Sequence, residues 1–217
     1  MVPVRSKFNV QKNGLLFINS FTLPFDTKIS LPIVGKIDLG KVVYGLCGGM
    51  CFAALDYFYA GQPVPAFKQP QDIPADYLLY LWDRQIDSMG VVVVPKVIEW
   101  MLHEDKDVGS STARYEVPKM RRQLDQGKPV VLGLVRGKGI SDPTVNHQVL
   151  AIGYDFDEAL RQIEIYLYDP NHPGSESNLT MNLANPSQGL QATQDTGETT
   201  RGLFVITYQP QHPPHEK

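Results

Sequence analysis

The sequence has few cysteines, no long apolar run and no excess of positive charge. Two cysteines in 217 residues, Cys47 and Cys51, cannot form a disulfide framework, so reduced thiols are expected. No apolar stretch approaches the ~18 residues of a membrane span, and the N-terminus lacks the apolar core of a signal peptide. We therefore expect a cytoplasmic protein that does not bind membranes.

The charges are balanced and do not form a basic surface. The chain has 20 Lys and Arg against 23 Asp and Glu, a formal net charge of −3. Lys119, Arg121 and Arg122 form only a local group, so no nucleic-acid partner is expected. No histidine has metal-ligand spacing to the cysteines, so neither a metal nor another cofactor is predicted.

The apolar pattern places helices mainly in the first half of the chain and strands in the second. We expect an α+β fold in which the helices pack on an antiparallel sheet formed largely by the C-terminal half. A single domain is predicted over residues 1–208, followed by a disordered tail over 209–217 with three prolines. Residues 170–200 are expected to be rich in loops. The predicted helices are 47–59, 73–89, 95–102 and 117–125, and the predicted strands are 14–23, 91–94, 130–135, 146–155, 161–168 and 202–208.

The segment Gly45–Tyr59 combines both cysteines with a glycine-flanked helix start. A thiol at that position lies near the positive end of the helix dipole, which favours its anionic form. Cys47 is therefore the expected nucleophile. Cys51 is expected to fill the core, although its position before Phe52-Ala53 keeps it open as an alternative nucleophile.

A thiol nucleophile needs an imidazole to move protons and a third group to orient that imidazole. His147 lies at the mouth of one predicted strand, and Asp169 ends the next. If the two strands pair as a hairpin, both side chains meet at one edge of the sheet. The sequence therefore predicts a triad of Cys47, His147 and Asp169.

These blocks resemble papain-like cysteine peptidases, nearest to the bacteriocin-processing (C39-like) branch. Three segments carry the resemblance, over residues 40–170 in outline: Cys47-Gly48 opening a helix, His147 followed by an apolar strand ending at Gly153-Tyr154-Asp155, and Asp169-Pro170. The resemblance implies a papain-like fold with an N-terminal nucleophile helix. It also implies a hydrolase that cleaves a peptide or amide substrate through a thioester.

One position departs from the family pattern. Family members usually carry a Gln about six residues before the nucleophile, whose amide helps to form the oxyanion hole, and Lys41 stands there in this chain. The backbone N–H groups of Cys47 and Gly48 are the expected replacement donors. Asn19, Tyr44 and Asn146 are further candidates for the oxyanion hole or the cleft. Three functions stay open: a thiol hydrolase, an acyl or amide transferase with the same triad, and a catalytically weak module that binds a peptide or ligand in the same cleft.

Overall fold

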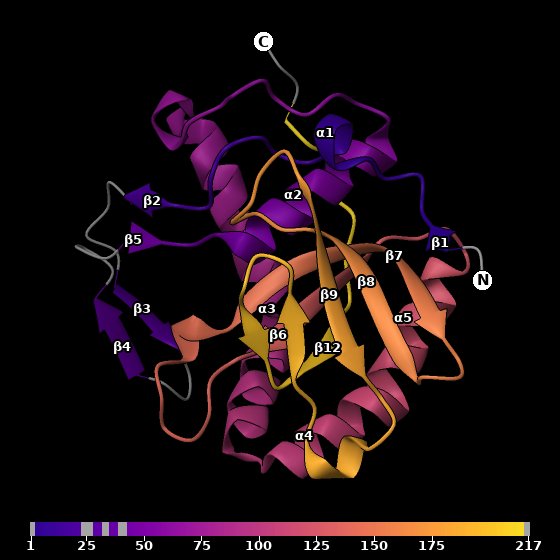
Figure 1. Cartoon of the computed structure of the whole chain (residues 1–217). Helices are drawn as coiled ribbons and strands as arrows, with labels where there is room; N and C mark the ends of the chain where they lie inside the picture. Colours follow the sequence, from indigo (N-terminus) through magenta and orange to yellow (C-terminus); the bar gives the residue numbers. More distant parts are fainter. Residues whose placement is uncertain (1–2, 23–27, 32–34, 39–42, 215–217) are drawn as a thin grey trace.

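The computed structural model describes residues 3–22, 28–31, 35–38 and 43–214 (Figure 1). Its helices and antiparallel strands agree with the predicted α+β class. The helices are α1 (Val10–Asn13), α2 (Cys47–Ala60), α3 (Ala75–Leu102), α4 (Asp105–Ser111) and α5 (Val117–Leu124). The strands are β1 (Val4–Arg5), β2 (Phe21–Thr22), β3 (Lys28–Leu31), β4 (Gly35–Asp38), β5 (Val43–Tyr44), β6 (Val130–Val135), β7 (His147–Asp157), β8 (Gln162–Tyr168), β9 (Glu176–Asn182), β10 (Ala192–Gln194), β11 (Thr199–Thr200) and β12 (Gly202–Ile206).

The main sheet is antiparallel and curled. Its strand order is β11-β10-β9-β8-β7-β6-β12, and β1 pairs with β7 beyond the end of β6. Every strand on the main path comes from the C-terminal half, as the sequence predicted. All six residues of β6 are buried, which is typical of a central strand covered on both faces.

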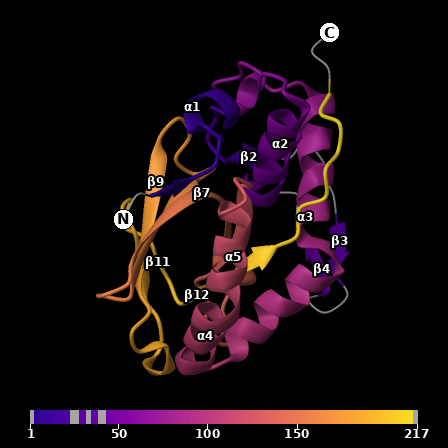
Figure 2. The same cartoon turned by 90° about the vertical axis from the view of Figure 1, so that its right-hand side faces the viewer.

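Helix α2 is the centre of the packing. One side of it packs on the sheet, where Phe52 and Leu55 share a core with Val131 and Leu150. Its other side packs on α3 in a second core that includes Met50. Figure 2 shows α2 and α3 on one side of strands β7 and β9. Because both sides of α2 are covered, residues 48–57 are all buried, including a charged one.

The described helices differ from the sequence predictions in the second quarter of the chain. Residues 91–94 are helical, so the strand predicted there is wrong: α3 resumes after a break at Gly90, where φ is +41° and ψ is −177°. Only glycine adopts such angles readily. Helix α4 and a π-helical turn, Thr112–Glu116, were not predicted. No described helix is both long enough and apolar enough to cross a membrane.

Two strand predictions also need correction. Of the strand expected at 14–23, only β2 forms, while Leu15 and Phe17 are buried without regular pairing. The region 170–200, expected to be rich in loops, contains β9, β10 and β11. In β9 the buried positions Ser177, Leu179 and Met181 alternate with more exposed polar residues, a pattern typical of a half-buried strand.

The last described residues contact the helices, and residues 215–217 of the predicted tail lie outside the described part of the chain. A disordered tail was expected from residue 209, but residues 209–214 lie against α2 and α3. The carbonyl oxygen of Gln209 accepts a hydrogen bond from Arg84 at 2.7 Å, and the backbone N–H of Gln211 donates to Asp56 at 2.9 Å. We call residues 209–214 the C-terminal strap; Figure 2 shows it running beside α3.

Candidate active site

Two glycines bring the start of α2 close to α3 and β7. A Cβ on Gly48 would lie 2.0 Å from Oγ of Ser88 and 2.5 Å from Oε1 of Gln148. A Cβ on Gly49 would lie 2.3 Å from a backbone oxygen of α3. Any larger residue would push the helix away from its neighbours. The pair of glycines therefore fixes the position of Cys47, the first residue of α2.

The hairpin of β7 and β8 brings His147 and Asp169 together. His147 begins β7, and Asp169 follows the last residue of β8. Because Leu150 pairs with Tyr168, both side chains lie at the same edge of the sheet. Nε2 of His147 lies 2.7 Å from Oδ1 of Asp169, and both residues are buried.

The thiol of Cys47 joins this pair. The imidazole of His147 and the backbone of Gly48 and Gln148 lie close enough to the sulfur to lower the pKa of Cys47. Since Nε2 of the imidazole faces the carboxylate, Nδ1 is the ring nitrogen left for the thiol. Cys47 is partly exposed, so solvent reaches the residue. The structure thus brings together the three side chains named from the sequence.

The electrostatics favour a thiolate beside an imidazolium. Burial acts to raise the pKa of Cys47, but the hydrogen bond and positive charge of His147 leave that pKa below its ordinary value. Burial acts to lower the pKa of His147, and the bonds to Asp169 and Cys47 raise it to about 9. Burial acts to raise the pKa of Asp169, whereas its bond to His147 lowers it to about 2. Near neutral pH the pair of His147 and Asp169 is therefore ionised, and the positive imidazole favours the thiolate of Cys47.

Asp169 has further partners that the sequence reasoning missed. Nε2 of Gln194 donates to its Oδ2 at 2.7 Å, and the backbone N–H of Asn171 donates to its Oδ1 at 2.8 Å. Gln194 is 1% exposed and ends β10, in the region that was expected to be loops. In β10 the residues alternate between buried and exposed, and Gln194 is on the buried side. No sequence pattern indicates that its partner is Asp169. These bonds hold the carboxylate in its ionised form.

Cys51 lies in the core. Its side chain is fully buried, with Sγ 3.8 Å from the carbonyl oxygen of Gln148. Burial raises its pKa well above the ordinary value, so this thiol stays protonated and inert. Of the two cysteines, the structure favours Cys47 as the reactive one.

Asn19 braces the start of α2. Its Oδ1 accepts the backbone N–H of Leu46 at 2.5 Å, and its Nδ2 donates to Oδ1 of Asn171 at 2.9 Å. This side chain therefore ties the residue before the nucleophile to the turn after Asp169. The side chain of Tyr44 and the whole of Lys41 lie outside the described residues.

Asn146 holds the loop before His147. Its Oδ1 accepts the backbone N–H groups of Arg136 and Gly137 at 2.9 and 3.1 Å. Its Nδ2 donates to Sδ of Met101 and to a backbone carbonyl of the same loop. Both amide hydrogens are thus used within the loop, and the role expected of Asn146 in the oxyanion hole or the cleft stays a prediction. The backbone of Gly48 helps to lower the pKa of Cys47.

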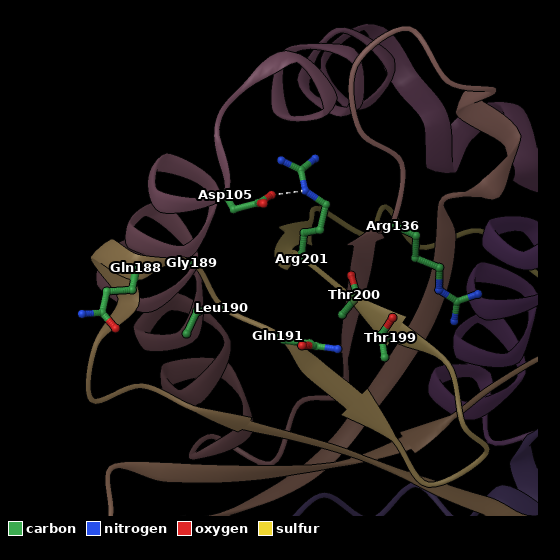
Figure 3. A pocket seen from close by; sticks show the side chains of 9 residues that line it. All are labelled: Asp105, Arg136, Gln188, Gly189, Leu190, Gln191, Thr199, Thr200 and Arg201. Carbon is green, nitrogen blue, oxygen red and sulfur yellow. Dashed lines mark hydrogen bonds and ion pairs between the residues drawn. The ribbon is translucent and has the colours of Figure 1, made fainter.

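A cavity of about 370 Å³ lies apart from these residues (Figure 3). Asp105 and Arg201 form an ion pair at its edge, with 2.5 Å between Oδ1 and Nε, and Arg136 points away from that pair. The cavity thus lacks a nucleophile with an adjacent base, and we place the candidate site at Cys47. Its lining residues are Asp105, Arg136, Gln188, Gly189, Leu190, Gln191, Thr199, Thr200 and Arg201.

Comparisons of the chain with protein-family models, curated proteins and solved structures found no match. The function is therefore inferred from the geometry of the site itself. Within the described ranges, no three His, Cys, Asp or Glu side chains are grouped as a metal site requires. The groups that the site brings together are a thiol, an imidazole and a carboxylate.

Proposed function

We propose that the protein is a cysteine-dependent hydrolase of peptide or amide bonds. Cys47 is the nucleophile, His147 the base and then the acid, and Asp169 the group that orients the imidazole. One observation supports the proposal: Cys47 opens a buried helix beside His147, which lowers the pKa of its thiol, and Nε2 of His147 lies 2.7 Å from Oδ1 of Asp169. A thiolate held beside an imidazolium is the reactive form of a cysteine nucleophile.

The reaction divides into two halves. The thiolate attacks the carbonyl carbon, forming a C–S bond and moving the carbonyl electron pair onto oxygen. As that pair returns, the C–N bond breaks, and His147 gives its proton to the departing amine. A thioester remains on Cys47. His147 then takes a proton from water, which attacks the thioester and releases the acid and the thiolate.

The proposal includes a papain-like fold of the bacteriocin-processing branch. Its support is the order of the parts along the chain. The nucleophile opens an early helix, the imidazole begins a strand of the C-terminal sheet, and the carboxylate follows the next strand. A Cβ at Gly48 would meet the side chains of Ser88 and Gln148, and one at Gly49 would meet the backbone of α3, which accounts for the two glycines after Cys47.

The proposal predicts a thioester on Cys47. We expect p-nitrophenyl acetate to acylate the wild-type protein, detected as p-nitrophenolate release and as an acetyl mass gain. Cys47→Ala and His147→Ala should each abolish it, because the first removes the nucleophile and the second its base. Cys51→Ser serves as the matched control and should acylate like the wild type.

The outcomes separate the three functions. Turnover of the thioester in water supports hydrolysis, and faster turnover with transfer to an added amine identifies a transferase. Wild-type protein acylated no faster than Cys47→Ala would leave a ligand-binding module and contradict the proposal.

A further inference from the structure

Arg136 carries a positive charge that no described residue neutralises. Its Nε is buried and has no hydrogen-bond partner among the described residues. None of the ion pairs formed within the described part of the chain includes its guanidinium. Arg136 as a whole is only partly buried, so a ligand can reach it. Because a buried charged donor without an acceptor is unfavourable, this side chain is suited to an anionic ligand.

The cavity of about 370 Å³ is lined by two arginines, Arg136 and Arg201, which differ in their partners (Figure 3). Nε of Arg201 forms the ion pair with Asp105. The same guanidinium donates to the carbonyl oxygens of Gly137 and His103 at 2.7 Å each. Arg136 points away from this group in Figure 3. Of the two arginines, Arg136 is therefore the one with a donor left for a ligand.

One wall of the cavity lies next to His147. Leu134 of β6 pairs with His147, and Arg136 follows Leu134 by two residues. The backbone N–H of Arg136 donates to Asn146, the residue before His147, at 2.9 Å. Strand geometry gives roughly 8 Å between the Cα atoms of Arg136 and His147. An extended peptide advances about 3.4 Å per residue, so about three of its residues span this separation.

A second wall of the cavity is connected to Asp169. Thr199 and Thr200 line the cavity and form β11, which pairs with β10. Strand β10 ends at Gln194, whose Nε2 donates to Asp169 at 2.7 Å. Thr199 and Gln191 are exposed and add a hydroxyl and an amide to the lining. The cavity is thus polar and borders the strands that carry the site, although none of the three site residues lines it.

We propose that Arg136 and the cavity it lines form a subsite for an aspartate or glutamate side chain of the substrate. This subsite rests on the proposed function, which supplies a peptide lying across Cys47. A carboxylate matches the guanidinium because Nε and one terminal nitrogen donate in parallel to its two oxygens. A phosphate dianion fits less well, since Arg201 is already paired and Asp105 adds negative charge at the cavity edge.

Peptide binding to the full-length Cys47→Ala protein tests the subsite without turnover. The probes are acetyl-Ala-Ala-Glu-Ala-Ala-amide and the same peptide with glutamine, titrated while the Nε–H signal of Arg136 is followed by NMR. We expect the glutamate peptide to bind about tenfold more tightly or better and to shift that signal. Arg136→Gln should remove the preference. Arg136→Lys should retain part of it, because the charge remains and the planar fork is lost. Lys128→Gln, at an exposed position, is the matched control and should retain all of it.

Cleavage of a peptide mixture tests the same subsite during turnover. Wild-type protein should cleave bonds that have an aspartate or glutamate at one position within about three residues, as located by mass spectrometry. Arg136→Gln should cleave without this enrichment.

Three results would overturn the subsite: no preference for the glutamate peptide, a preference that Arg136→Gln retains, or tighter binding of inorganic phosphate than of that peptide. Failure of the proposed function is distinguishable from these. Wild-type protein that cleaves no peptide, while Cys47→Ala binds the glutamate peptide through Arg136, would contradict the hydrolase and support the subsite. Cleavage without enrichment for acidic residues would support the hydrolase and contradict the subsite.

Discussion

Replacing Arg84 with methionine is expected to lower the free energy of unfolding by about 3–5 kcal/mol, because it leaves a buried carboxylate without its counter-ion. Nε of Arg84 lies 2.7 Å from Oδ2 of Asp56, and both side chains are fully buried. The same guanidinium donates to Asp87 and to the C-terminal strap. Asp56 also accepts hydrogen bonds from Tyr80 and Tyr208 at 2.6 Å each. One ion pair therefore joins α2, α3 and the chain end.

Urea unfolding followed by circular dichroism measures this effect. The matched control is Arg5→Met, which removes the exposed pair between Arg5 and Glu176. That change should cost no more than about 1 kcal/mol. Equal effects of the two substitutions would contradict the account. Arg84 and Asp56 also hydrogen-bond to the backbone of the C-terminal strap. We therefore expect proteases to cleave the strap of Arg84→Met before the rest of the chain.

Asp169→Asn is expected to lower the acylation rate of Cys47 by about a thousandfold or more. In a serine triad the same exchange costs about 10⁴ in kcat. The asparagine amide would donate to Nε2 of His147, so the ring proton would move to Nδ1. A ring protonated at Nδ1 cannot accept the proton of the thiol. The rate is measured with p-nitrophenyl acetate, and Asp155→Asn, on β7, is the control. A fall of less than about tenfold would show that Asp169 does not set the tautomer.

The same pair predicts a window of maximal stability. The pKa of Asp169 is lowered to about 2, so its contribution is complete above its ordinary value near 3.8 and is lost as pH falls to 2. The pKa of His147 is raised to about 9, so its contribution is complete below its ordinary value of 6.5 and is lost as pH rises to 9. The pair should therefore stabilise fully between about pH 4 and 6.5. In Asp169→Asn the free energy of unfolding should change less with pH than in the wild type, both below about pH 4 and above about pH 6.5.

The site residues that could be predicted from the sequence each lie at the start or the end of one helix or strand. Cys47 opens a helix, His147 opens a strand, and Asp169 follows the next strand. A hairpin of the two strands brings His147 and Asp169 together independently of the rest of the fold. Their contact could therefore be predicted from the apolar pattern of the two strands and the assumption that these strands pair.

The parts that were missed depend on contacts between distant segments. Gln194 meets Asp169, and Gln85 meets the start of α2, across separations that no periodicity encodes. Disorder was predicted for the strap because it contains three prolines. Its backbone is hydrogen-bonded to Arg84 and Asp56, which form a buried ion pair. The break at Gly90 was hidden because the apolar residues after it suit a strand as well as a helix.

The central claim is that His147 activates Cys47, and the pH dependence of alkylation tests it most directly. The rate of labelling by iodoacetamide is followed from pH 4 to 10, and the modified residue is located by peptide mass spectrometry. We expect labelling at Cys47 and not at Cys51, with a rise centred clearly below the ordinary thiol pKa of 9.0. In His147→Gln that rise should move above 9.0, because burial then acts on the thiol without a cation beside it. A wild-type rise at or above 9.0, or one that His147→Gln leaves in place, would contradict the account.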